Sequence, residues 1–284
     1  MQIQGSPTIV YPFEYGIGPL TVTGFGLAVL AAFMISQVIC MRELTRRGHH
    51  DHAAAMPDVV IACVLGTLVG GKLYYVLVIT KDWSDLFTRA GFVFYGGFIG
   101  SVIASFVIAK WRKLRFARLA DVAALALAAG YSVGRTGCWA VGDDYGRPWD
   151  GALAVAFPQG APPTTAGVLQ QLFGIPMPPG TTPDTVLGVH PTQLYETVLA
   201  FVMFLVLWRL RDHKHAEGWL FGVWAILAGI ERFIIEFFRA KDDRFFGPLT
   251  VAQVISLAII AVGVTLLAVR RETGPGRPGI HATA

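Results

Sequence analysis

The stretch LADVAALALAAGYSVGRTGCWAVGDDYGRPWD, residues 119–150, begins as an apolar helix and ends in a group of glycines, acids and arginines. An apolar run of about 20 residues is long enough to cross a lipid bilayer as a helix. A charged side chain within such a span costs several kcal/mol, so it is usually paired and functional. Because Arg135 lies where this run ends, the stretch predicts a membrane helix with a candidate site at its boundary.

Similar apolar windows recur along the whole chain. The 284 residues are 54% hydrophobic and only 15% charged, with a mean hydropathy of +0.55. This composition is too apolar for a soluble domain of this length. It predicts one all-α membrane domain over residues 1–284 with seven membrane-spanning helices. The expected spans are residues 17–40, 56–79, 92–110, 119–138, 193–209, 217–238 and 249–269.

The basic residues predict how these spans are oriented. Lysines and arginines cluster in the loops after the first, third and fifth spans and in the C-terminal tail. Positive charge marks the cytoplasmic side, which puts the C-terminus in the cytoplasm and the N-terminus outside. The proline-rich segment 139–191 then lies outside. We expect an ordered cap over the outer mouth of the bundle, with a flexible loop as the alternative.

The charge and the cysteines exclude several classes of site. A net charge of +4 is modest for a membrane protein and gives no support for nucleic-acid binding. Cys40, Cys63 and Cys138 are scattered, with no CxxC or Cys/His ligand spacing. No disulfide framework, metal site or cofactor is therefore expected.

The sixth span carries charges in AGIERFIIEFFRAKDD, residues 228–243. Arg232, Glu236 and Arg239 are spaced four and three apart, so they share one helix face. Such a polar stripe must face the bundle interior or a wet cavity. A structural Arg–Glu pair explains Glu236 with one arginine and leaves one arginine over. Together with Arg135, that arginine predicts a cationic site suited to a phosphate or carboxylate, although Arg135 alone is equally well explained by snorkelling to lipid headgroups.

The third span begins with FYGGFIG, residues 94–100, which places Tyr95 beside Gly96 and Gly97. These residues are candidates for a site that faces the bundle. The alternative is a close helix contact of the small-xxx-small type through Gly96 and Gly100.

The fifth span is preceded by HPTQLYE, residues 190–196, which clusters His190, Gln193, Tyr195 and Glu196 at a membrane boundary. A helix start with proline near its first turn explains part of this motif. It does not explain so many hydrogen-bonding groups, so we count the motif among the candidate site segments.

Six short motifs, in chain order, resemble those of the phosphatidylglycerol–prolipoprotein diacylglyceryl transferase family. They are PLTVTGFGLAVL (19–30), GGKLYYVL (70–77), FYGGFIG (94–100), GRTGCWAVGDDYG (134–146), HPTQLYE (190–196) and RFIIEFFR (232–239). The resemblance covers nearly the whole chain. It implies a seven-span bundle with its N-terminus outside, as the charge pattern also does.

The resemblance also implies an activity and its partners. Members of this family transfer a diacylglyceryl group from phosphatidylglycerol to the thiol of the lipobox cysteine in a prolipoprotein signal peptide. The implied location is the bacterial cytoplasmic (inner) membrane, among membrane lipids and with the active site toward the outer leaflet. Arg135 and Arg232 match family arginines and are assigned to the lipid phosphate, with Arg239 in support. The implied catalytic residues are Arg135, Arg232 and Tyr95, and the implied substrate-binding residues are Gly96, Gly97, Gly142, Asp143, Gly146, His190, Gln193, Tyr195, Glu236 and Arg239.

The chain departs from the family pattern at several polar positions. Tyr95 replaces the family's catalytic histidine, and Asp143 stands where a glutamate is usual. Family asparagines are Cys138 and Val141 here, and family tyrosines are Phe25 and Ala228. Tyr95 can act as a base only if neighbouring cations lower its pKa from about 10. Two alternatives stay open: a divergent paralogue using another acceptor or lipid, and a lipid-binding or transport protein, which the lack of inverted repeats disfavours.

Overall fold

The computed structural model describes residues 3–18, 20–88, 93–177, 180–240 and 244–270. The chain forms two compact units. One contains Met1–Ser36 and Ala124–Ala284, and the other contains Gln37–Ala123. Arg271 and Arg277 of the basic C-terminal tail, and the first residue of the expected third span, lie outside the described residues.

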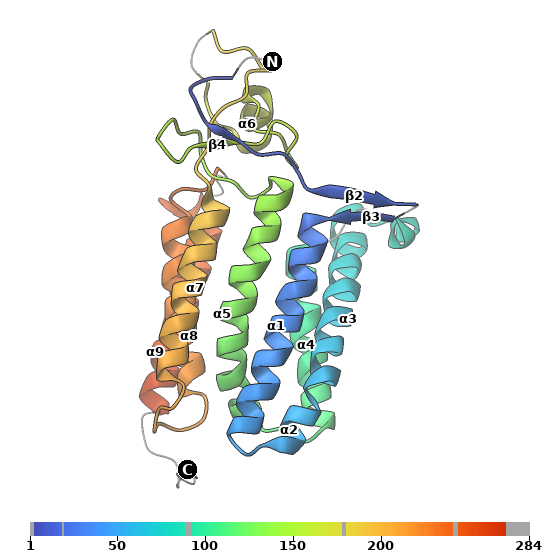
Figure 1. The fold of residues 1–284 in the computed structure, drawn as a ribbon, viewed down its shortest axis with the longest axis vertical. Helices are drawn as coiled ribbons and strands as arrows, with labels where there is room; N and C mark the ends of the chain where they lie inside the picture. The colour runs from blue at the N-terminus through green and yellow to red at the C-terminus, as the bar shows by residue number, and fades with distance from the viewer. Residues whose placement is uncertain (1–2, 19, 89–92, 178–179, 241–243, 271–284) are drawn as a thin grey trace. The chain divides into compact units, whose positions relative to one another are not determined.

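A helix lies at the position of each expected span, in the expected chain order (Figure 1). These helices are α1 (Gly24–Arg46), α3 (Met56–Tyr74), α4 (Phe94–Trp111), α5 (Phe116–Val141), α7 (Thr192–Leu210), α8 (Trp219–Ile235) and α9 (Val251–Val269). Within the described residues, five stretches are long and apolar enough to cross a membrane: Gly24–Arg46, His50–Thr80, Phe116–Val141, Thr192–Leu210 and Val251–Val269. The chain is therefore a mostly helical membrane protein, while seven spans and their orientation stay predictions.

The first helix begins at Gly24, whereas the expected span began at residue 17. The preceding residues form an antiparallel hairpin of β2 (Glu14–Ile17) and β3 (Leu20–Thr23). Gly18 has a φ of +59°, which suits a tight turn. The β-branched residues of LTVT favour a strand over a helix. Hydropathy alone therefore misassigned the start of this span.

The unit Gln37–Ala123 is built around a close contact between α3 and α4. Gly66 and Gly70 of α3 lie against Gly96 and Gly100 of α4, and a Cβ on any of the four would overlap backbone of the other helix. The packing interpretation of Gly96 and Gly100 is thereby confirmed. The unit also contains α2 (His50–Ala54), a π-helical segment (Tyr75–Thr80) and a 3-10 helix (Trp83–Phe87).

In the other unit, the segment between α5 and α7 packs around its own core. Short strand β4 (Val155–Ala156) pairs in parallel with β1 (Thr8–Ile9), and α6 (Ala166–Phe173) lies in the same part of the chain (Figure 1). The buried residues of this core are Tyr145, Val155, Phe157, Ala166, Leu169, Leu187 and Val189. The described part of residues 142–191 is thus an ordered structure. Its position as a cap over the outer mouth stays a prediction.

The same unit continues with α8 and α9, which are joined by the strand pair β5 (Arg244–Phe246) and β6 (Leu249–Thr250). The two helices approach closely where Gly222 of α8 faces Gly263 of α9. Thr250 Oγ1 caps α9 by accepting a hydrogen bond from the Gln253 backbone N–H, and the Thr250 backbone N–H donates to Gln253 Oε1. Helix α9 therefore packs against α8, whose end contributes to the candidate site.

Candidate functional site

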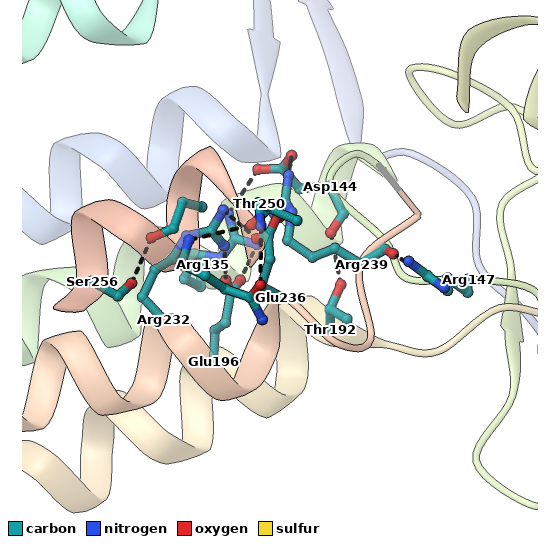
Figure 2. A network of polar contacts seen from close by, with 12 residues as sticks. Arg135, Asp144, Arg147, Thr192, Glu196, Arg232, Glu236, Arg239, Thr250 and Ser256 are labelled. Atoms are coloured by element: carbon teal, nitrogen blue, oxygen red, sulfur yellow. Dashed lines mark hydrogen bonds and ion pairs between the residues drawn. The ribbon is translucent and has the colours of Figure 1, made fainter. Parts of the chain in front are cut away.

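Three arginines from two chain segments meet in one network of the unit Met1–Ser36 and Ala124–Ala284 (Figure 2). Arg135 lies near the end of α5, Arg232 in the last turn of α8, and Arg239 four residues after α8 ends. Glu196, on the second turn of α7, contacts two of them. The ends of three helices therefore define the site.

Arg135 is held on two sides. Its Nη1 donates to Asp144 Oδ2 at 2.9 Å and to Cys138 Sγ at 3.3 Å, while its Nη2 pairs with the Glu196 carboxylate. The side chain of Arg135 is 10% exposed, and Glu196 is almost fully buried. Removing one partner of such a buried pair typically costs about 3–5 kcal/mol, because an uncompensated charge is left behind.

Arg232 and Arg239 complete the network through Glu236. Arg232 Nη2 lies 2.7 Å from Glu236 Oε2, and Arg239 Nε lies 3.9 Å from the same oxygen. Arg232 Nη1 also lies 3.7 Å from Glu196 Oε1, and Arg239 Nη2 lies 2.7 Å from Asp144 Oδ1. Each of the three arginines thus contacts two carboxylates.

The expectation that one arginine is left over after pairing was wrong for these residues. The sequence spacing within α8 revealed only Glu236 as a partner. Glu196 and Asp144 come from other segments and neutralise the remaining guanidinium charge. Helix α8 also ends at Ile235, so Glu236 and Arg239 continue the polar face in the turn that follows rather than on the helix itself.

Asp143 and Asp144, just after α5, have opposite electrostatic environments. Burial acts to raise the pKa of Asp144, but Arg239 and Arg135 outweigh it and lower the pKa to about 2. Burial, followed by the neighbouring charge of Asp144, raises the pKa of Asp143 to about 6. Asp143 Oδ1 is buried and has no hydrogen-bond partner among the described residues. Asp144 is therefore a fixed anion, while Asp143 titrates near neutral pH.

The HPTQLYE motif positions this acidic loop. Gln193 is fully buried, and its Nε2 donates to the backbone oxygen of Asp143 at 2.6 Å. His190 stacks on Trp149 with 4.4 Å between ring centroids, and its Nδ1 lies 3.3 Å from Tyr195 Oη. Burial lowers the pKa of His190. These contacts hold the loop against the start of α7; a direct role in substrate binding stays a prediction.

Two glycines give the loop its shape. Gly142 ends α5 with a φ of +69°, a conformation that favours glycine, and packs against Phe157. Gly146 lies against the backbone of Phe238 and the side chain of His190, where a Cβ would clash. Both residues are explained by packing and turn geometry, and their part in a headgroup pocket stays a prediction.

Tyr95, Gly96 and Gly97 belong to the unit Gln37–Ala123. Gly96 and Gly97 contact α3, and the Tyr95 side chain is exposed. Their assignment to the same site as the arginines therefore stays a prediction.

Two carboxyl groups of the site, Asp144 and Glu231, were not predicted from the sequence. Glu196 belongs to the predicted HPTQLYE segment, but spacing gave no sign that Glu196 or Asp144 pairs with arginines. Glu231 was a single acid beside Arg232 in an apolar helix, which is itself a signal for a functional group.

Cys138, Asp143 and Asp144 bring ligand atoms within 4.8 Å of one another, a donor set that could hold a metal ion. However, Arg135 already donates to Cys138 Sγ and Asp144, and Arg239 binds the other oxygen of Asp144. These guanidinium groups compete with any cation for the same atoms. We therefore assign Cys138 and Asp144 to the arginine network.

The apolar helices and the buried arginine–carboxylate network define a multi-pass membrane protein with a polar site among its helix ends. Residues 12–269 match the family model described as prolipoprotein diacylglyceryl transferase. The chain belongs to this family, and it is a transferase. The resemblance carried by the six sequence motifs is thereby confirmed.

Individual relatives agree with the family match. The chain is 30% identical over 277 residues to the phosphatidylglycerol–prolipoprotein diacylglyceryl transferase of Geobacter sulfurreducens, covering 93% of this chain and 97% of that protein. It is 31% identical over 291 residues to the protein of the same name from Xanthomonas oryzae pv. oryzae, covering 96% and 95%. The similarity therefore extends over nearly the full length of both chains.

Proposed function

We propose that this chain transfers the diacylglyceryl group of phosphatidylglycerol to the thiol of a lipobox cysteine in a prolipoprotein signal peptide. The observation that carries the proposal is the convergence of Arg135, Arg232 and Arg239 in one buried network. Family membership supports the same reaction. In this proposal the partners are phosphatidylglycerol, the prolipoprotein and the surrounding membrane lipids.

The reaction needs positive charge at the leaving group. The cysteine sulfur attacks a glyceryl carbon, a C–S bond forms as the C–O bond to phosphate breaks, and the electron pair leaves with the phosphate oxygen. The departing glycerol phosphate thereby gains negative charge. Guanidinium groups fixed in a water-poor site stabilise that charge and can bind two phosphate oxygens at once.

Arg232 is the arginine best placed to receive the lipid phosphate first. Its side chain is 33% exposed, against 14% for Arg239 and 10% for Arg135. Its contact with Glu196 is also loose, at 3.7 Å. A phosphate can replace that contact while Arg135 keeps the buried Glu196 neutralised.

We place the protein in the bacterial cytoplasmic membrane with its N-terminus outside and this site toward the outer leaflet. The basic loops after the first, third and fifth expected spans support this orientation. The site lies at the ends of α5 and α8 and the start of α7, the side that these loops predict to be external.

The test uses the purified full chain, phosphatidylglycerol vesicles and a lipobox peptide. Mass spectrometry should detect a diacylglyceryl adduct on the peptide cysteine. Arg232→Lys should lower the rate at least tenfold because lysine lacks the planar fork. Arg209→Lys, a change to an exposed arginine at the end of α7, is the matched control and should retain the rate. Consumption of phosphatidylglycerol without modification of the peptide would instead indicate another acceptor. If the phosphatidylglycerol is not consumed, the proposal is contradicted.

A further inference from the structure

Glu231 is a buried carboxyl group that the arginine network does not neutralise. It lies in α8 directly before Arg232, is only 6% exposed, and its Oε1 has no hydrogen-bond partner among the described residues. A buried, unpartnered acid inside an apolar helix is costly, so it is expected to serve a function.

The charges around this position explain why Glu231 differs from its neighbours. Among the described residues, three guanidinium groups face five carboxyl groups, namely Asp143, Asp144, Glu196, Glu231 and Glu236. Asp144, Glu196 and Glu236 each contact two arginines. Protonating any of these three would break ion pairs, which makes them poor proton acceptors. Asp143 and Glu231 carry no such pair, and only Glu231 lies within a helix that forms the site.

Glu231 is nevertheless electrostatically coupled to the phosphate-binding arginines. From α7 it is faced by Glu196, from α5 by Arg135 and Tyr131, and from its own segment by Arg232 and Arg239. Helix α9, which packs against α8, contains no titratable residue. The group therefore lies within electrostatic range of the arginines to which the proposed function assigns the lipid phosphate.

We propose that Glu231 accepts the proton of the acceptor thiol during diacylglyceryl transfer, an assignment that rests on the proposed function. The thiol becomes a nucleophile only as it loses its proton. As the C–S bond forms and the C–O bond breaks, Glu231 holds that proton. It then passes the proton to the departing glycerol phosphate, which restores the carboxylate for the next cycle.

The decisive variant is Glu231→Gln, which keeps the size of the side chain but cannot take up a proton. We expect adduct formation at pH 7 to fall on the order of 10²-fold, the usual contribution of a positioned base. Glu231→Asp should retain more activity than Glu231→Gln. Asp184→Asn, at an exposed position of the 142–191 segment, is the control and should retain the wild-type rate. Gel filtration and thermal unfolding should show that each variant is folded.

Two readouts separate proton transfer from a structural role. The defect of Glu231→Gln should shrink as the pH approaches 9, because thiolate then forms without a base (thiol pKa about 8.5). A selenocysteine peptide, whose selenol ionises more readily, should restore most of the rate of Glu231→Gln but not that of Arg232→Lys. An unchanged Glu231→Gln rate, or a defect independent of pH and of the selenol, would overturn the role of Glu231. No adduct with the wild-type protein would overturn the proposed function, and the role of Glu231 with it.

Discussion

Arg239 donates from Nη2 to Asp144 Oδ1 at 2.7 Å, although the two residues lie 95 positions apart in the chain. Arg135 binds the other oxygen of the same carboxylate at 2.9 Å. Asp144 therefore joins the segment after α8 to the end of α5. A single surface-facing carboxylate keeps two arginines in place beside the exposed edge of Arg232.

Asp144→Asn should destabilise the protein at pH 7. A neutral amide loses two charge-assisted hydrogen bonds, so the free energy of unfolding should fall by about 1–2 kcal/mol. The fall is no larger because part of the carboxylate is open to solvent. The pKa of Asp144 is about 2 in the folded protein and about 3.9 when unfolded. Its stabilisation is therefore complete above pH 4 and is lost as the pH falls toward 2.

The measurement is thermal unfolding of the detergent-solubilised protein between pH 3 and pH 7, with Asp184→Asn as the control. The difference in Tm between wild type and Asp144→Asn should narrow at pH 3. An equal difference at both ends of the range would show that Asp144 stabilises the fold without its charge.

Substitutions at Arg135 and Arg232 should differ in their effect on stability, although both should lower transfer. Arg135→Ala leaves Glu196 buried with only a 3.7 Å contact to Arg232, so we expect a loss of about 3–5 kcal/mol together with loss of transfer. Arg232→Lys keeps a positive charge beside the buried Glu236 and leaves Glu196 paired with Arg135, so the protein should stay folded while transfer falls. Parallel measurements of Tm and of adduct formation test this, and equal Tm losses in the two variants would contradict it.

The helices of this fold were predictable because their apolar length is a local property of the chain. The start of α1 was not, since residues 14–23 are apolar enough for a span but form a hairpin whose turn depends on Gly18. The end of α8 was also not predictable: the expected span ran to residue 238, but Glu236 and Arg239 lie beyond the last helical residue.

The arginines of the candidate site could be predicted from the sequence, whereas the carboxylates that pair with them could not. Arg135 and Arg232 stood out as charges in or beside apolar helices. Their partners Glu196 and Asp144 are contributed by separate segments, and no local pattern says which acid meets which arginine. Glu231 was not singled out, because nothing in the local sequence shows that its carboxyl group is buried with an oxygen that lacks a hydrogen-bond partner among the described residues.

Gly100→Ala should weaken the contact between α3 and α4. A Cβ at this position would overlap the backbone oxygen of Gly66, which cannot move without shifting the helix. We expect the free energy of unfolding to fall by about 1–3 kcal/mol, as for other overpacked contacts. Gly134→Ala in α5 is the matched control, because a Cβ there meets open space. Thermal unfolding should show a lower Tm for Gly100→Ala only, and equal effects of the two changes would contradict the close helix contact.

Asp143→Asn should stabilise the protein in a pH-dependent manner. Burial and Asp144 raise the pKa of Asp143 to about 6 in the folded state, above the unfolded value of about 3.9. The wild-type protein therefore loses stability as the pH rises from 4 through 6, because the folded state disfavours the ionised carboxyl group. The amide cannot ionise and is free of this penalty, which is at most about 3 kcal/mol.

The Tm of Asp143→Asn should thus equal that of wild type near pH 4 and exceed it above pH 6. If Asp143 also shapes the headgroup pocket, as the family resemblance implies, transfer should fall even though the protein is more stable. Thermal unfolding from pH 4 to pH 8, combined with the adduct assay at pH 7, tests both parts. A Tm difference that does not change with pH would show that the Asp143 carboxyl group stays protonated, or stays ionised, throughout this range.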